Sequence, residues 1–197
     1  MAIRRFSGSS LTAGSKSSKL WDQETTLGTF ESIATATCSG SESSVTFSNI
    51  PQGYTHLQIR YMLRTLRTAG YDFQRITFNG DTTSNYSDHL IKGNGTAASA
   101  EANNGGALIY IDYGASDFYT AGIYTVGILD ILDYSNTSKY KTTRQLNGFD
   151  ANGSGYVNFN SGNWRSTSAI TQIDITKGYT DGFKQYSSFA LYGIRGA

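Results

Sequence analysis

The chain has 197 residues, of which 16% are charged, and a net charge of +1 at pH 7. This length suits one domain around one core. The near-neutral charge excludes a global field that would draw the folded part to nucleic acid or to a membrane surface.

Residues 1–28 are expected to form an extended basic arm rather than part of a core. Ser, Gly, Thr and Lys dominate this stretch, and such a composition cannot bury enough apolar surface to fold alone. Its first twenty residues carry four positive charges and no negative one, so the rest of the chain sums to about −3. We expect the arm to bind a partner through its basic and isolated apolar side chains: Ile3, Arg4, Arg5, Phe6, Leu11, Lys16, Lys19, Leu20 and Trp21.

Residues 29–197 are expected to form one all-β body. Leu57, Ile59, Tyr61 and Leu63 alternate with polar or long side chains, which is the period of a strand with one buried face. Comparable runs, separated by Gly, Asn and Asp, follow along the chain. The predicted strands lie near residues 31–38, 43–48, 55–64, 73–79, 86–92, 107–113, 121–133, 139–149, 155–160, 170–176 and 187–194.

Many short strands without a helical period indicate an antiparallel β-sandwich, and we expect a jelly-roll-like arrangement. Turns are expected at Asn79-Gly80, at 93–95, at 103–106 and at Asn152-Gly153, because Gly and Asn tolerate positive φ. Pro51 suits a turn between two strands, since its ring fixes φ.

No common enzyme signature is present, and we expect a protein that is not an enzyme. Cys38 could act as a nucleophile only with His56 or His89, and its simpler interpretation is a small buried strand residue. Asp130 and Asp133 are three residues apart, so a regular strand would point them to opposite faces. A glycosidase would need two carboxyl groups facing each other.

A calcium loop is suggested only weakly by residues 150–155. Asp150, Asn152 and Ser154 match the first half of such a loop, but Ser161 stands where the bidentate Glu should be. We therefore expect a glycine-rich hairpin turn there, and neither a metal ion nor a cofactor.

Several aromatic residues could present flat platforms to sugars. The candidates for a glycan-facing surface are Tyr113, Tyr119, Trp164 and Tyr179. The alternative is that these rings fill the core or an oligomer interface.

Four segments resemble a family of small structural proteins of tailed bacteriophages, notably those that infect cyanobacteria and other aquatic bacteria. The likeness covers about three quarters of the chain, from Val45 to the C-terminus. It is carried by FSNIPQGYTHL leading into QIR, ITFNGDTTSNYSDH, DILDYSNTSKYKTTRQLNGFD and QYSSFALYGIRGA.

The resemblance implies a virion part and supplies no active site. We expect a capsid decoration or cement protein, made in the host cytoplasm because no secretory or membrane-spanning segment is evident. Its expected partners are the major capsid protein or other virion proteins, and copies of itself in dimers or trimers. The alternative is a tail or head-fibre module that binds host-surface carbohydrate. Binding of nucleic acid or of a membrane is not expected.

Overall fold

A computed structural model describes residues 29–111, 113–179 and 182–196 as an assembly of β-strands without a helix. No helix in these ranges could therefore cross a membrane. The strands are Phe30–Thr37 (β1), Ser44–Phe47 (β2), His56–Leu63 (β3), Gln74–Phe78 (β4), Tyr86–Gly93 (β5), Ala98–Gly106 (β6), Ile109–Tyr110 (β7), Thr125–Leu132 (β8), Lys141–Asp150 (β9), Gly155–Trp164 (β10), Ile173–Lys177 (β11) and Ser188–Ile194 (β12).

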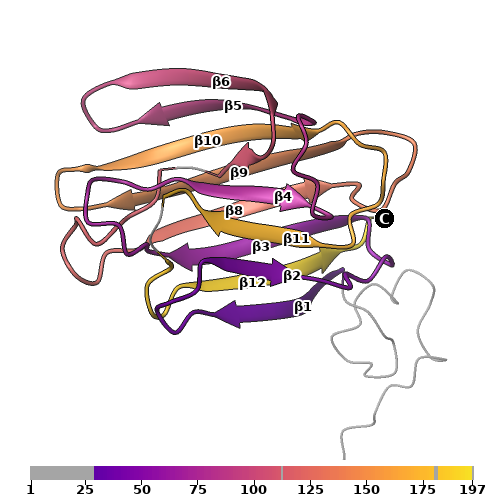
Figure 1. Cartoon of the computed structure of the whole chain (residues 1–197), viewed down its shortest axis with the longest axis horizontal. Coiled ribbons are helices and arrows are strands. Elements are labelled where there is room, and N and C mark those ends of the chain that lie inside the picture. The colour runs from indigo at the N-terminus through magenta and orange to yellow at the C-terminus, as the bar shows by residue number, and fades with distance from the viewer. Residues whose placement is uncertain (1–28, 112, 180–181, 197) are drawn as a thin grey trace, which may run out of the picture.

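The strands form two antiparallel sheets that pack face to face (Figure 1). The larger sheet has the order β1-β12-β3-β8-β9-β10-β5-β6, and the smaller sheet has the order β2-β11-β4-β7. The chain alternates between the sheets, so β1-β12-β3-β8 and β2-β11-β4-β7 make the two halves of a jelly roll. The hairpins β5–β6 and β9–β10 are inserted into this arrangement and widen the larger sheet. The predicted jelly-roll-like sandwich is confirmed.

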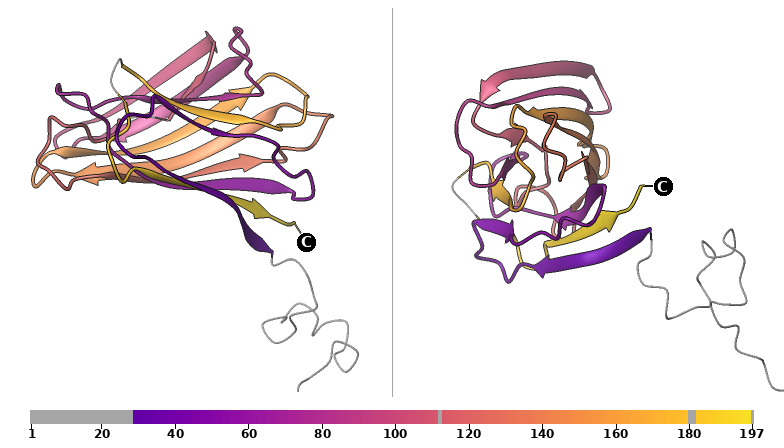
Figure 2. Two further views of the ribbon diagram at one scale, coloured as in Figure 1. Left: turned by 60° about the horizontal axis from the view of Figure 1, so that its bottom comes forward. Right: turned by 90° about the vertical axis from the view of Figure 1, so that its right-hand side faces the viewer.

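The core lies between the two sheets, as the end-on view in Figure 2 illustrates. The inward side chains of β3 are those that the alternation predicted, because Leu57, Ile59, Tyr61 and Leu63 are all buried. The smaller sheet covers them with its own inward-facing residues: Val45, Phe47, Ile76, Phe78, Ile173 and Ile175. Side chains from both sheets therefore fill one continuous core.

Most turn predictions are confirmed by the backbone. Asn79, Gly80, Asn152 and Gly153 all have positive φ between strands. The predicted turn at residues 103–106 is wrong, because these residues belong to β6, where Asn103, Asn104 and Gly106 pair with β5. Gly105 has the expected positive φ of 70° but lies at a bulge in this pairing. β10 also runs to Trp164 rather than ending at residue 160, since it pairs with β9 along its whole length and with β5 from Val157 to Trp164.

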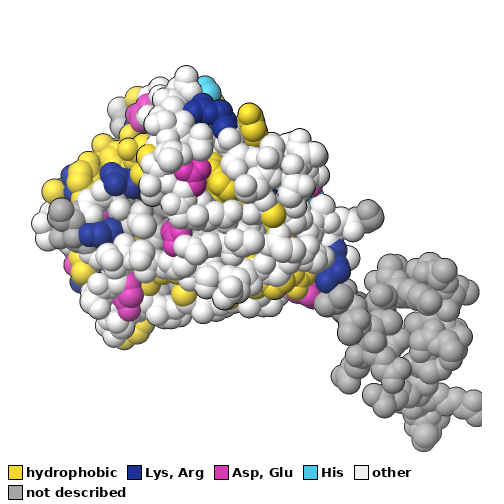
Figure 3. Space-filling model, turned by 45° about the vertical axis from the view of Figure 1, so that its right-hand side comes forward, with side chains coloured by type: hydrophobic (Ala, Val, Ile, Leu, Met, Phe, Trp, Pro, Cys, Tyr) yellow, Lys and Arg dark blue, Asp and Glu magenta, His cyan; other side chains and the backbone are white. Residues whose placement is uncertain are grey.

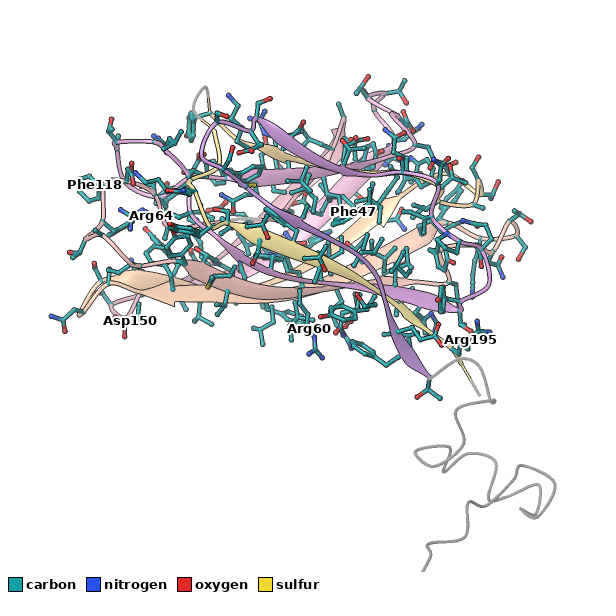
Figure 4. The ribbon with its side chains drawn as sticks, turned by 90° about the horizontal axis from the view of Figure 1, so that it is seen from below. Phe47, Arg60, Arg64, Phe118, Asp150 and Arg195 are labelled. Carbon is teal, nitrogen blue, oxygen red and sulfur yellow. The ribbon has the colours of Figure 1, made fainter. Side chains whose placement is uncertain are left out.

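A buried arginine organises the loops at one end of the sandwich (Figure 4). Arg64 donates from Nε to Asp117 Oδ1 at 2.9 Å, and its other two nitrogens donate to the carbonyls of Tyr119, Thr120 and Ile123. Lys184 donates to the second Asp117 oxygen at 2.6 Å. These contacts satisfy a charge that would otherwise be costly to bury.

Candidate functional site

The outer face of the larger sheet carries an unusual set of apolar side chains. In parts of β9 and β10 the usual alternation is reversed, with apolar residues outside and amides inside. β8 and β5 carry apolar residues on both faces. The exposed members are Ile91, Val126, Ile128, Leu146, Val157 and Phe159, and Ile91 reaches 62% exposure. We call these six residues the apolar row. Single exposed apolar residues are ordinary, but a contiguous group marks an interaction site.

The strand register makes the apolar row continuous. Ile128 pairs with Leu146, Leu146 with Phe159, and Phe159 with Ile91 on four neighbouring strands. Directly paired side chains on one face lie about 4.5–5.5 Å apart at Cβ, so these four touch or nearly touch.

A hollow lies beside this line of side chains. Val126 and Val157 both pair with Gly148, which contributes no side chain between them. A Cβ at Gly148 would lie only 2.8 Å from the carbonyl oxygen of Tyr156, so the backbone requires glycine there. The hollow has a volume of about 780 Å³, and Arg60, Ile128 and Leu146 also line it.

Polar side chains border the apolar row on its other side. Arg144 pairs with Asp130 at 2.9 Å, and Gln58 donates to the same carboxyl group at 2.8 Å. Arg60 projects from this face (Figure 4) and lies 5.0 Å from the ring centroid of Phe30. An apolar centre with a polar rim is the usual anatomy of a protein–protein interface.

The inner face of the same strands is held by amide side chains. Gln145 donates to the Ile111 carbonyl at 2.8 Å and to the Tyr61 hydroxyl at 2.7 Å, and Asn160 donates to the Tyr110 carbonyl at 2.8 Å. These hydrogen bonds join β9 and β10 to the segment around β7 and so determine which face of each strand points inward. Because the amides point inward, the apolar row on the opposite face points to solvent.

The residues proposed for the N-terminal arm, from Ile3 to Trp21, lie outside the described residues. The four candidate glycan-facing residues have different positions. Trp164 is only 2% exposed, packs on Phe78 and Tyr86, and donates from Nε1 to Asp81 Oδ2 at 2.8 Å. It is a core residue and does not face solvent, because the longer β10 carries it to the inner face.

The other three candidates belong to one network of aromatic contacts. Tyr113 is buried and lies 5.1 Å from Phe73, and Phe73 lies 5.9 Å from Tyr179. Tyr119 is connected to the same network through Phe149 and Tyr156. Only Tyr179, at 43% exposure, presents a large part of its ring to solvent.

The residues considered for catalysis have different surroundings in the fold. Burial raises the pKa of the Cys38 thiol to about 11, aided by Glu42, so the neutral thiol predominates at pH 7. His56 accepts a hydrogen bond at Nδ1 from the backbone N–H of Asp133 at 2.9 Å. Asp130 lies on the outer face of β8, whereas Asp133 follows the end of β8 and has a φ of 49°.

Residues 150–155 form the hairpin turn between β9 and β10, as predicted. Asp150 accepts a hydrogen bond from the N–H of Asn152 at 2.8 Å, and Ala151 donates to the carbonyl of Ser154 at 2.7 Å. Within the described ranges no group of three or more His, Cys, Asp or Glu could hold a metal ion.

No protein-family model, no curated protein and no solved structure matches this chain. Function must therefore be inferred from the surface itself. The sequence reasoning did not single out the apolar row, although the alternation in RQLNGF and YVNFNS placed its members on one side of each strand.

Proposed function

We propose that this protein is a non-enzymatic structural component of a phage particle, a capsid decoration protein whose copies associate through the apolar row. Association is supported by the continuous apolar surface across β8, β9, β10 and β5. Water contact with such a surface is unfavourable at roughly 25 cal/mol per Å². A partner that covers it would remove that cost. The assignment to a phage particle is supported by the sequence resemblance alone.

A second copy of the chain is the partner that fits this face. In a two-fold arrangement the same residues meet from both sides, so one apolar row covers another. The hollow at Gly148 offers room for a projecting ring such as that of Phe159 from the opposite copy. Arg144 and Asp130 at the rim offer charges of both signs, which suits contact between identical surfaces.

The charges around the apolar row support a protein partner over nucleic acid. Phosphate backbones bind to clustered Lys and Arg, whereas the rim of the apolar row carries Arg60 and an Arg144–Asp130 ion pair. On the face that Figure 3 shows, basic and acidic side chains lie among many neutral ones.

The N-terminal residues 1–28 are proposed to anchor the protein to the shell. Their support is composition, because basic residues and isolated apolar side chains can order on a neighbouring protein. Binding through the arm and through linked copies would combine several weak contacts into a strong attachment on a repeating lattice. The major capsid protein or another virion protein is then the partner, and the virion is the location.

Deleting residues 2–20 should abolish incorporation into particles. The reason is that the deletion removes every predicted arm contact except Trp21, while β1 begins only at Phe30. Incorporation is measured by immunoblotting purified particles. Replacing residues 2–20 with a Gly-Ser sequence of equal length separates the role of the side chains from that of length. Undiminished incorporation of both variants would overturn the anchoring role.

Replacing Leu146 with Asp should convert the oligomer to monomers. The substitution places a charge at the centre of the apolar row, where a partner copy would have to bury it. Sedimentation velocity of the full chain measures the association state. Thr142→Asp, on the same face of β9 but beyond the rim residue Arg144, is the matched control and should leave association unchanged. A wild-type chain that is monomeric at high concentration would contradict association through this face.

A second candidate function is binding of host-surface carbohydrate by a tail or head fibre. The observation that favours it is a polar groove beside Tyr179, which residues of β5 and β6 help to line. This groove is separate from the centre of the apolar row, because β10 lies between β8–β9 and β5–β6 in the larger sheet.

A further inference from the structure

A groove lies where the β5–β6 hairpin extends past the edge of the smaller sheet. β7 is the last strand of the smaller sheet, so no strand of that sheet lies opposite β6 (Figure 1). The opening between β4 and β7 on one side and β5 and β6 on the other has a volume of about 300 Å³. Its lining includes Phe73, Arg75, Asp88, Asn103, Tyr110 and Tyr179.

Asp88 provides a fixed acceptor in the groove. It is only 2% exposed, and it accepts hydrogen bonds from Asn103 Nδ2 at 3.0 Å and from the N–H of Tyr110 at 3.4 Å. A carboxylate has about four acceptor positions, so these two bonds leave capacity for a ligand. The two contacts also hold the carboxyl group in one orientation, which lowers the entropy cost of binding.

Arg75 provides a donor in the same groove. Its Nε is buried and has no hydrogen-bond partner within the described residues, and the guanidinium lies 5.8 Å from the ring centroid of Tyr110. No ion pair joins Arg75 to Asp88. A buried donor without an acceptor costs free energy, and a ligand hydroxyl would satisfy it.

Aromatic rings form one wall of the groove. Phe73 lies 5.7 Å from Tyr110 and 5.9 Å from Tyr179. Arg67 lies 3.6 Å from the ring centroid of Tyr179, and this contact holds the exposed ring in place. The face of an aromatic ring is electron-rich, so it attracts the slightly positive C–H bonds of an apolar ligand face.

We propose that this groove binds a neutral saccharide of one or two rings, with vicinal hydroxyls on Asp88 and Arg75 and a C–H face on Tyr179. A sugar offers both kinds of surface at once, since its hydroxyls donate and accept while its axial C–H bonds form an apolar patch. The volume lies at the lower end of the roughly 300–1,000 Å³ found for small-ligand sites, which limits the ligand to a short one.

Other ligand classes fit this lining less well. Asp88 and Glu101 both line the groove and would repel a phosphate or a sulfate. Glu101 pairs with Lys92, so that lysine is already engaged by a carboxylate. A lipid tail would leave the buried Nε of Arg75 without an acceptor and would offer no donor to Asp88. The site does not depend on the attachment role proposed above, and either can fail without the other.

The test is saturation-transfer NMR and isothermal titration of the full chain with a panel of neutral mono- and disaccharides. We expect at least one saccharide to bind, and Tyr179→Ala to weaken it by about tenfold or more through loss of the stacking face. Tyr140→Ala is the matched control, because Tyr140 is also exposed, precedes β9 and does not line the groove. It should leave the affinity unchanged.

A second variant guards against a folding artefact. Arg75→Met keeps the length of the side chain and its packing but removes the donor, and it should weaken the same saccharide by about tenfold. No binding by any member of the panel at millimolar concentration would overturn the proposal. So would binding that survives both Tyr179→Ala and Arg75→Met, or a preference for anionic ligands.

Discussion

Trp164→Ala should lower the free energy of unfolding by about 3–5 kcal/mol, the usual cost of removing a large buried aromatic side chain. The indole packs between Phe78 and Tyr86, and its Nε1–H satisfies Asp81. The substitution would open a cavity and leave that carboxylate short of a donor. Thermal unfolding followed by circular dichroism should register a fall in Tm of roughly 6–20 °C for a chain of this size.

The control for this experiment is Phe118→Ala, because Phe118 is 60% exposed at a loop and should change Tm little. The experiment also separates the two roles considered for Trp164. A variant with wild-type Tm and impaired saccharide binding would place the indole at a binding surface and contradict its core position.

Arg64→Met should cost about 3–5 kcal/mol, because removing one partner from a buried charged network leaves the others unpaired. The carbonyls of Tyr119, Thr120 and Ile123 would lose their donor, and Asp117 would keep only Lys184. Urea unfolding of wild type and of Arg64→Met measures the difference in their free energy of unfolding. Arg60→Met makes the same chemical change on the exposed outer face and should cost about 0.5 kcal/mol or less.

The Arg64 network also predicts how this difference depends on pH. Burial raises the pKa of Asp117, but the hydrogen bonds and charges of Lys184 and Arg64 outweigh it and hold that pKa below its usual value. A lowered carboxyl pKa stabilises the fold above the pKa of the unfolded chain, and this stabilisation is lost as the pH falls below about 4. The difference in free energy of unfolding between wild type and Arg64→Met should therefore become smaller at acid pH. If this difference is the same at neutral and at acid pH, the charge of Asp117 does not contribute to it.

The strands could be predicted from the sequence where one face is strictly apolar. His56–Leu63 and Ser188–Ile194 alternate cleanly, and both are central strands of the larger sheet. β6 could not be predicted in this way, because Ala98–Gly106 contains small and polar residues with low strand propensity. It forms a strand because β5 offers it a ladder of backbone partners along nearly its whole length, with one bulge at Gly105.

The candidate sites were harder to predict than the strands. In RQLNGF the alternation assigns Leu146 to one side of β9 and Gln145 to the other, but it does not say which side faces the core. Burial of apolar residues would place Leu146 inside, and the structure does the opposite.

The groove could not be predicted from the sequence for a different reason. Arg75, Asp88 and Tyr179 come from three distant segments, and only the pairing of β4 with β7 and the packing of β7 against β5 bring them together.

β1 is an edge strand of the larger sheet, and its first residue, Phe30, pairs with Ile194 of β12. If residues 1–28 hold the protein to a shell, any mechanical load enters the body at Phe30. A pull across the strand would break the β1–β12 ladder one hydrogen bond at a time, whereas a pull along the strand would be shared by the whole ladder. The direction in which the arm leaves its anchor would therefore set the force at which a particle sheds this protein.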